Sequence, residues 1–176
     1  MNKFEQIAEE MSHAYVGGVY QHYYGHDSTG SFRTVSADPT KNLVYKCIMR
    51  DSDKIINFAE YYAWQAMPQK LRHLFARVWY ISQNRRVLVM ERMPYTNVKY
   101  ERAVLGKKRI VKHFPSLDLK QWDSPVSRFV GDLHEKNFGI TATNRLKVID
   151  YGGIGNWRNV SEDIIINDTL EAFSMV

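Results

Sequence analysis

The residues best suited to chemistry lie in two short segments in the last third of the sequence. The first reads Val130-Gly-Asp-Leu-His-Glu-Lys-Asn137, and the second, Asp150-Tyr-Gly-Gly153, begins thirteen residues after Asn137. An aspartate can orient an attacking hydroxyl and accept its proton. An asparagine and a second aspartate supply the hard oxygen ligands that Mg²⁺ prefers. Asp132, Asn137 and Asp150 therefore predict phosphoryl transfer from a Mg²⁺-bound nucleotide, and the alternative is a polar loop followed by an ordinary turn.

Both segments resemble motifs of the protein-kinase-like superfamily. Gly-Asp-Leu-His-x-x-Asn is similar to the catalytic loop of its aminoglycoside phosphotransferase and choline kinase branch, and Asp-Tyr-Gly is similar to its Asp-Phe-Gly element. The resemblance implies ATP and Mg²⁺ as cofactors, Asp132 as the catalytic base, and Asn137 and Asp150 as metal ligands. His134 stands where small-molecule phosphotransferases of the superfamily carry a histidine. It has two open roles, a contact to the transferred phosphate or a hydrogen bond that holds the loop.

A lysine and a glutamate in the first half of the sequence match two further positions of that superfamily. Strand alternation over residues 42–49 places Lys46 on one face with two β-branched residues. Glu60 is the only glutamate between residues 11 and 90, and it lies in a helix predicted over residues 51–67. Because an unpaired buried ammonium is costly, we predict an ion pair between Lys46 and Glu60. The resemblance makes Lys46 the phosphate contact and Glu60 its orienting partner. Taken separately, a snorkelling lysine and a solvated acid are the simpler interpretations.

The segment over residues 28–35 is similar to a reduced form of the superfamily's glycine-rich loop. Its backbone N–H groups would hold the phosphates, its tip would be capped by an aromatic ring, and its last valine would lie over the adenine. Arg33 replaces the later glycine of the family motif, and a plain hairpin bend is the alternative interpretation. The resemblance assigns nucleotide contacts to four residues of this loop: Gly30, Ser31, Phe32 and Val35.

The segment over residues 87–93 is similar to the fifth strand and hinge of kinases. By that resemblance, Met90 lies at the entrance of the adenine pocket, and backbone groups from Glu91 to Met93 hydrogen-bond the base. A buried strand with no contact to a nucleotide is the alternative interpretation.

These residues must be positioned by an α+β fold. The resemblance implies a bilobal protein-kinase-like fold, a single domain over residues 1–176, with a β-rich N-lobe over about residues 1–91, a hinge at about 91–94 and a truncated C-lobe over about 95–176. Only 26 residues follow Asp150, which is too few for the activation segment and helical platform of a protein kinase. Such brevity resembles the compact kinase-like proteins of bacteriophages. Periodicity and turn residues predict helices over 3–14, 51–67 and from 161, and strands over 31–37, 42–49, 77–82, 86–91, 138–140 and 146–149.

Composition narrows the class of protein further. The chain has 176 residues, of which 44% are hydrophobic and 24% charged, as in soluble globular proteins. No apolar run approaches the ~20 residues of a membrane helix, and Cys47 is the only cysteine, a core residue by its position in a strand. We therefore expect a cytoplasmic protein (in the host cytoplasm if it is phage-encoded) with no membrane partner.

The formal net charge of +5 favours anionic partners. The basic residues around Gly106 to Lys112 are expected to form a solvated face, so nucleic acid is an unlikely partner, although an anionic acceptor or RNA is the alternative. Taken together, the residues predict an ATP-dependent phosphotransferase, a kinase that moves the γ-phosphate of Mg-ATP to a hydroxyl acceptor on a protein or small molecule. The alternative is a catalytically silent kinase-like binding module that blocks or recruits a host protein, which the short C-terminal region favours.

Overall fold

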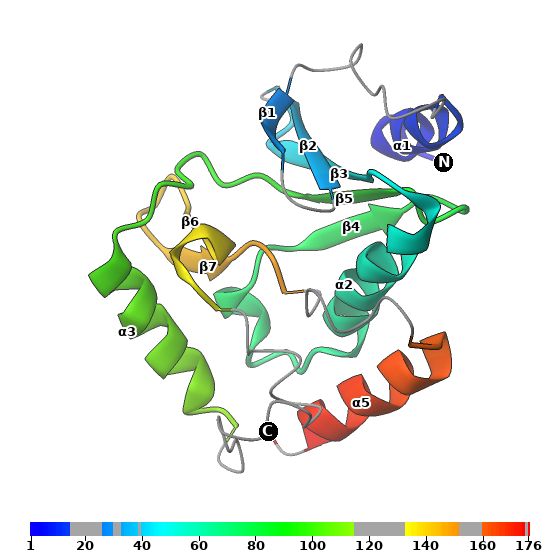
Figure 1. Cartoon of the computed structure of the whole chain (residues 1–176). Coiled ribbons are helices and arrows are strands. Elements are labelled where there is room, and N and C mark those ends of the chain that lie inside the picture. The colour runs from blue at the N-terminus through cyan, green and yellow to red at the C-terminus, as the bar shows by residue number, and fades with distance from the viewer. Residues whose placement is uncertain (15–25, 30–32, 39, 115–132, 152–159, 175) are drawn as a thin grey trace.

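The computed structural model of the chain describes residues 1–14, 26–29, 33–38, 40–114, 133–151, 160–174 and 176 (Figure 1). The fold is α+β, with a five-stranded antiparallel sheet in the order β1-β2-β3-β5-β4 and a separate two-stranded sheet. The strands of the large sheet are β1 (His26–Thr29), β2 (Arg33–Asp38), β3 (Leu43–Ile48), β4 (Val78–Ile81) and β5 (Val87–Glu91). The small sheet pairs β6 (Phe138–Ile140) with β7 (Leu146–Val148).

Four α-helices surround the sheets in the described part of the chain: α1 (Lys3–His13), α2 (Lys54–Ala66), α3 (Tyr100–Val111) and α5 (Glu162–Ser174). Figure 1 shows α1 and α2 on opposite faces of the large sheet, α5 beside α2, and α3 beside the small sheet. Single 3₁₀ turns precede α2, precede β4 and lead into β6, at Asp51–Asp53, Arg72–Leu74 and Glu135–Asn137. No helix among the described residues has both the length and the apolar character needed to cross a membrane.

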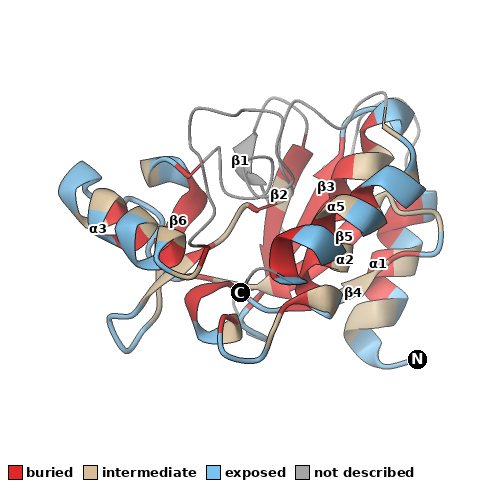
Figure 2. Cartoon of the chain, turned by 90° about the horizontal axis from the view of Figure 1, so that it is seen from below, coloured by how far each residue is buried: buried red, intermediate tan, exposed pale blue. Residues whose placement is uncertain are grey.

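Strand alternation divides the core between the two faces of the large sheet. On one face Tyr45 and Cys47 of β3 pack with Ile7, Ala8 and Met11 of α1. The opposite face belongs to the main core, where α2 and the small sheet meet the large sheet. Figure 2 shows buried residues along the strands of the large sheet and exposed residues on the outer sides of the helices. This arrangement places the even-numbered positions of β3, including Lys46, on the face covered by α2.

The observed boundaries follow local sequence signals. The Asn2 side chain accepts a hydrogen bond from the Glu5 backbone N–H, and Glu5 accepts one from the Asn2 backbone in return, a capping box that starts α1. Helix α2 ends at its C-cap residue Met67 because the next residue is Pro68, and proline cannot continue a helix. The predicted helix over 51–67 is a 3₁₀ turn followed by α2, and the predicted strands over 31–37 and 42–49 begin at Arg33 and Leu43.

Two elements were not predicted from the sequence. Strand β1 is made of four polar residues, which lack the apolar alternation of a half-buried strand. Helix α3 contains Gly106 in its interior, where glycine weakens a helix. A Cβ at Gly106 would clash with Leu146 and approach Phe138 to 2.9 Å. The glycine therefore permits close packing of α3 on the small sheet.

Candidate functional site

Four charged side chains from four separate parts of the chain meet between the large sheet and α2. Arg33 comes from β2, Lys46 from β3, Glu60 from α2, and Asp150 from the segment just after β7. Arg33, Lys46 and Glu60 are almost fully buried, and the Asp150 side chain is 24% exposed. With two cations and two anions, this charged cluster is formally neutral. Neutrality matters because a net charge in the interior is costly to desolvate.

The predicted ion pair between Lys46 and Glu60 is present. The Lys46 Nζ lies 2.9 Å from both carboxylate oxygens of Glu60 and donates a further hydrogen bond of 2.5 Å to the Ile149 carbonyl oxygen. It also lies 3.8 Å from Asp150 Oδ1. The ammonium group of β3 is thus held between α2 and the segment that carries Asp150.

Glu60 is the centre of the cluster and has no exposed surface. Besides the two bonds from Lys46, its Oε2 accepts a hydrogen bond of 2.6 Å from Arg33 Nη1. Its Oε1 accepts one of 3.1 Å from the Tyr151 backbone N–H. A fully buried carboxylate is stable only when its oxygens are satisfied in this way. Glu60 therefore connects α2 to β2, β3 and the segment around Asp150.

Arg33 is the member of the cluster that the sequence analysis did not assign to the site. Its Nη2 lies 2.5 Å from Asp150 Oδ1, and its Nη1 donates to Glu60 and, at 3.3 Å, to Asn57 Oδ1. Val35 pairs directly with Lys46, so Arg33 is the diagonal neighbour of Lys46 on the same face of the sheet. The signal available in the sequence was an arginine at an inward-facing strand position where the resemblance calls for glycine.

The cations hold the Asp150 carboxyl in its charged form. Burial alone would raise the pKa of Asp150, but the charges of Arg33 and Lys46 and the hydrogen bond from Arg33 outweigh burial and lower it. Burial, assisted by the charge of Arg33, lowers the pKa of Lys46. Burial also opposes the charge on Arg33, yet Asp150 and Glu60 together raise its pKa. Arg33 and Asp150 are therefore both ionised at neutral pH.

The segments that carry the residues predicted to hold Mg²⁺ lie next to each other in the structure. The Ile149 backbone N–H donates a 2.8 Å hydrogen bond to the Asn137 carbonyl oxygen, which brings buried Asn137 beside the residue that precedes Asp150. An asparagine and an aspartate are suitable oxygen donors for Mg²⁺, which completes its shell with waters and substrate phosphates. Within the described residues no group of three or more His, Cys, Asp and Glu side chains could hold a metal by itself. The donor set thus fits a metal bound together with a nucleotide, but Arg33 already occupies Asp150 Oδ1.

His134 is exposed and lies near enough to Asp150 that its charge helps to lower the pKa of that carboxyl. Its Nδ1 accepts a 3.2 Å hydrogen bond from the Lys136 backbone N–H, which caps the 3₁₀ turn that ends at Asn137. Of the two open roles, this bond is consistent with holding the loop. Contact of His134 with a transferred phosphate stays a prediction.

The residues predicted to contact the base lie along β5 and just after it. Met90 is fully buried and pairs with Val44, and Met93 is 5% exposed. The Glu91 backbone N–H donates to the Arg77 carbonyl oxygen at 2.8 Å, and its side chain faces away from the charged cluster, toward Lys147. Base binding by this segment stays a prediction.

Several predicted site residues lie outside the described residues: Asp132, Gly30, Ser31 and Phe32. Val35 is described and lies half-buried on β2, opposite Lys46. The structure therefore brings together Lys46, Glu60 and Asp150, with Asn137 beside them.

Comparison with solved structures gave a weak structural likeness. No protein-family model and no curated protein matched the sequence. Among solved structures, the chain is similar to the choline kinase LicA from Streptococcus pneumoniae, with a TM-score of 0.47 and 12% sequence identity. The match covers 96% of this chain and 79% of that chain. A likeness at this level does not establish a function.

Proposed function

We propose that the protein binds Mg²⁺-ATP and transfers its γ-phosphate to a hydroxyl acceptor on a protein or a small molecule. The observation that carries this proposal is the convergence of Lys46, Glu60 and Asp150 from a strand, a helix and a loop. A buried lysine held by a glutamate, next to an ionised aspartate, is an arrangement suited to binding the phosphates of a metal-nucleotide complex. In this proposal the α+β fold is a bilobal kinase-like fold with its hinge near residues 91–94.

Each residue has a distinct role in the proposed reaction. Lys46 binds the nucleotide phosphates, and Glu60 fixes the direction of the Lys46 side chain. Asn137 and Asp150 hold Mg²⁺, which, when bound, neutralises charge that develops on the phosphate oxygens. Asp132 orients the acceptor hydroxyl and accepts its proton as the acceptor oxygen bonds to the γ-phosphorus and the bond to the β–γ bridging oxygen breaks, which releases ADP.

Arg33 adds a condition to this proposal. Its guanidinium already neutralises the Asp150 carboxylate across a distance of 2.5 Å. Mg²⁺ and Arg33 therefore compete for the negative charge of the Asp150 carboxylate, and in this proposal Mg²⁺-ATP binding weakens the ion pair of Asp150 with Arg33. The free energy of weakening that ion pair lowers the apparent affinity for Mg²⁺-ATP.

The same ion pair favours a second candidate function, a catalytically silent kinase-like module that binds another protein. In that case Arg33 is a permanent structural substitute for the metal, because it satisfies Asp150 without a ligand. The two candidates differ in one measurable property. A phosphotransferase binds ATP more tightly when Mg²⁺ is present, whereas a silent module does not.

Thermal unfolding with and without Mg²⁺-ATP tests the proposal. A ligand that binds only the folded state raises its stability by RT ln(1 + [L]/Kd), so binding appears as a shift in Tm. We expect a shift for the parent protein, a larger one for Arg33→Met measured against its own ligand-free Tm, and a shift without Mg²⁺ dependence for Asp150→Ala. Asp163→Ala, which removes an exposed carboxylate on α5, is the matched control and should behave like the parent.

The Asp132→Asn variant separates binding from transfer. It should retain the Mg²⁺-ATP shift and lose transfer, because the proposed base acts on the acceptor rather than on the nucleotide. If neither the parent nor Arg33→Met shifts with Mg²⁺-ATP, the phosphotransferase proposal is wrong and the silent module is favoured.

A further inference from the structure

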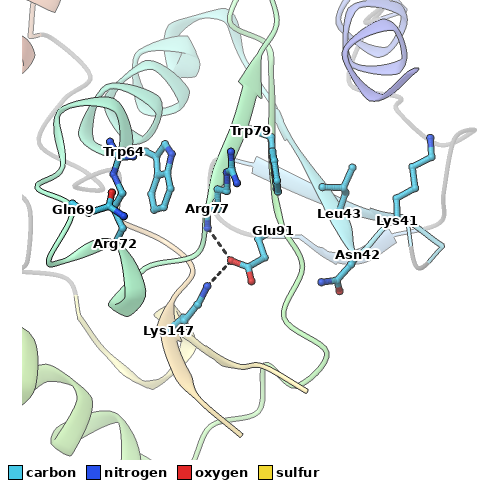
Figure 3. Close-up of a pocket in the computed structure, with 10 residues that line it drawn as sticks. All are labelled: Lys41, Asn42, Leu43, Trp64, Gln69, Arg72, Arg77, Trp79, Glu91 and Lys147. Atoms are coloured by element: carbon cyan, nitrogen blue, oxygen red, sulfur yellow. Dashed lines mark hydrogen bonds and ion pairs between the residues drawn. The ribbon is translucent and has the colours of Figure 1, made fainter. Parts of the chain in front are cut away.

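A pocket separate from the charged cluster opens where β3 begins and β5 ends. It has a volume of about 530 Å³ and lies between the start of β4, the end of α2 and Lys147 of β7 (Figure 3). Volumes of roughly 300–1,000 Å³ are typical of small-molecule sites. No residue of the charged cluster lines it, so a ligand bound here would not touch the proposed nucleotide site.

The lining of this pocket is strongly basic. It includes four cationic side chains and one carboxylate: Lys41, Arg72, Arg77, Lys147 and Glu91. The formal charge is therefore 4 − 1 = +3. Glu91 is already engaged, because its Oε2 accepts hydrogen bonds from Lys147 Nζ at 2.7 Å and from the Arg77 backbone N–H at 3.0 Å. Figure 3 shows both bonds meeting at the Glu91 carboxylate.

Three of these cations carry a charge that no described carboxylate offsets by an ion pair. In the part of the chain that the structure describes, Lys41, Arg72 and Arg77 have no ion pair with a carboxylate. The hydrogen bonds of the Arg72 side chain go to neutral backbone carbonyls, at 3.2 Å for Met67 and 3.4 Å for Gln65. These bonds fix the guanidinium in place without neutralising it. The pocket lining thus carries positive charge that no described carboxylate pairs with, and the Arg72 guanidinium is held in place by its hydrogen bonds.

Two tryptophans line the pocket beside the cations, of which Trp79 is 40% exposed and Trp64 8% exposed. The Arg77 guanidinium carbon lies 3.6 Å from the centroid of the Trp79 ring, and that of Arg72 lies 5.3 Å from the centroid of the Trp64 ring. A guanidinium stacked on an aromatic ring keeps the N–H donors in its own plane available for an anion. Planar donors of this kind match the oxygens of phosphate in a bidentate manner.

We propose that this pocket binds a small organic phosphate, a phosphate monoester carried on a flat ring. The phosphate, with a charge near −2 at neutral pH, binds at Arg77, attracted by the net positive charge of the lining, and the ring packs beside Trp79, whose side chain is 40% exposed. A single carboxylate carries half that charge and would leave more of the basic lining uncompensated. The proposal is independent of the proposed phosphotransferase activity, because the two sites share no residue.

Calorimetric titration with phenyl phosphate tests the proposal, since this probe carries a ring and a phosphate but no adenine for the other site. We expect saturable binding to the parent protein and at least a tenfold loss of affinity in Arg77→Gln, the change expected when one charge-assisted bidentate contact is removed. Arg109→Gln, which removes an exposed arginine of α3, is the matched control and should stay within twofold of the parent. Lys41→Gln, an exposed turn residue, should weaken binding as well.

Inorganic phosphate, phenol and benzoate separate the parts of the probe. Each should bind at least tenfold more weakly than phenyl phosphate, because each lacks either the ring, the phosphate or the second negative charge. Equal affinity for inorganic phosphate would overturn the ring contact, and equal affinity for benzoate would overturn the selectivity for phosphate. An absence of saturable binding by the parent, or equal losses in Arg77→Gln and Arg109→Gln with both variants folded by circular dichroism, would overturn the site itself.

Discussion

Removing Arg33 and Asp150 together should cost less stability than the sum of the costs of removing each alone. Arg33→Met leaves Lys46 to balance two carboxylates, Glu60 and Asp150. The double variant Arg33→Met with Asp150→Asn leaves a balanced pair of Lys46 and Glu60. The comparison therefore measures how strongly Arg33 and Asp150 depend on each other in the absence of any ligand.

The expected magnitudes follow from burial and distance. Arg33 is 5% exposed and Glu60 is fully buried, so Arg33→Met should lower the free energy of unfolding by about 3–5 kcal/mol, as when one partner of a buried pair is removed. Asp150→Asn should cost about 1–3 kcal/mol, since its side chain is 24% exposed and Arg33 keeps its bond to Glu60. Two unit charges 4 Å apart interact by about 4 kcal/mol at an effective dielectric constant of 20, which bounds their coupling. We expect the double variant to cost about 2 kcal/mol less than the sum of the single variants.

Urea unfolding at pH 7, followed by tryptophan fluorescence, gives the four free energies of this cycle by linear extrapolation. Arg109→Met, an exposed control on α3, should change stability by less than about 0.5 kcal/mol. Additivity of the two single variants to within about 0.5 kcal/mol would refute the coupling between Arg33 and Asp150. The argument that Arg33 competes with Mg²⁺ for Asp150 would then lose its basis.

Three other predictions concern pH, the thiol and a helix contact. The folded protein lowers the pKa of Asp150, so the ionised Asp150 stabilises the fold above the usual aspartate pKa, and this stabilisation is lost as the pH falls through the lower folded value. In urea unfolding between pH 6 and pH 3, the free energy of unfolding should therefore fall less steeply for Asp150→Asn than for the parent. Burial raises the pKa of Cys47 to about 12, so a disulfide reagent at pH 8 should label it only as fast as the protein opens, and labelling at the rate of a free thiol would disprove its burial. Gly106→Ala should lower stability by about 1–3 kcal/mol through overpacking against Leu146 and Phe138, whereas a gain in Tm would show that helix propensity prevails.

The parts of the site that sequence reasoning predicted depend on local periodicity. Lys46 faces inward because strand residues alternate, and Glu60 faces the same way because it lies on the buried stripe of α2. Both directions are fixed by neighbours within a few residues. The contact between Lys46 of the strand and Glu60 of the helix is long-range. The free-energy cost of an unpaired buried ammonium was enough to predict it.

The parts that were not predicted depend on contacts between distant segments. The partners of Arg33 lie 27 and 117 residues away along the chain, and nothing near Arg33 identifies either of them. Likewise, Gly106 lowers the helix propensity of α3. That loss is offset by close packing on the small sheet, which lies some 30 to 40 residues later in the sequence. Tertiary packing decided both cases against local propensity.

The central claim, transfer of the γ-phosphate of Mg²⁺-ATP, is tested most directly with ATP labelled on that phosphate. The protein is incubated with labelled ATP, Mg²⁺ and a cell extract, beside Asp132→Asn as the control, and label is followed into protein, small molecules and free phosphate. The account predicts label in an acceptor fraction with the parent and a loss of that label with Asp132→Asn. Equal labelling with both proteins, or no transfer by a parent protein that binds ATP, would contradict it.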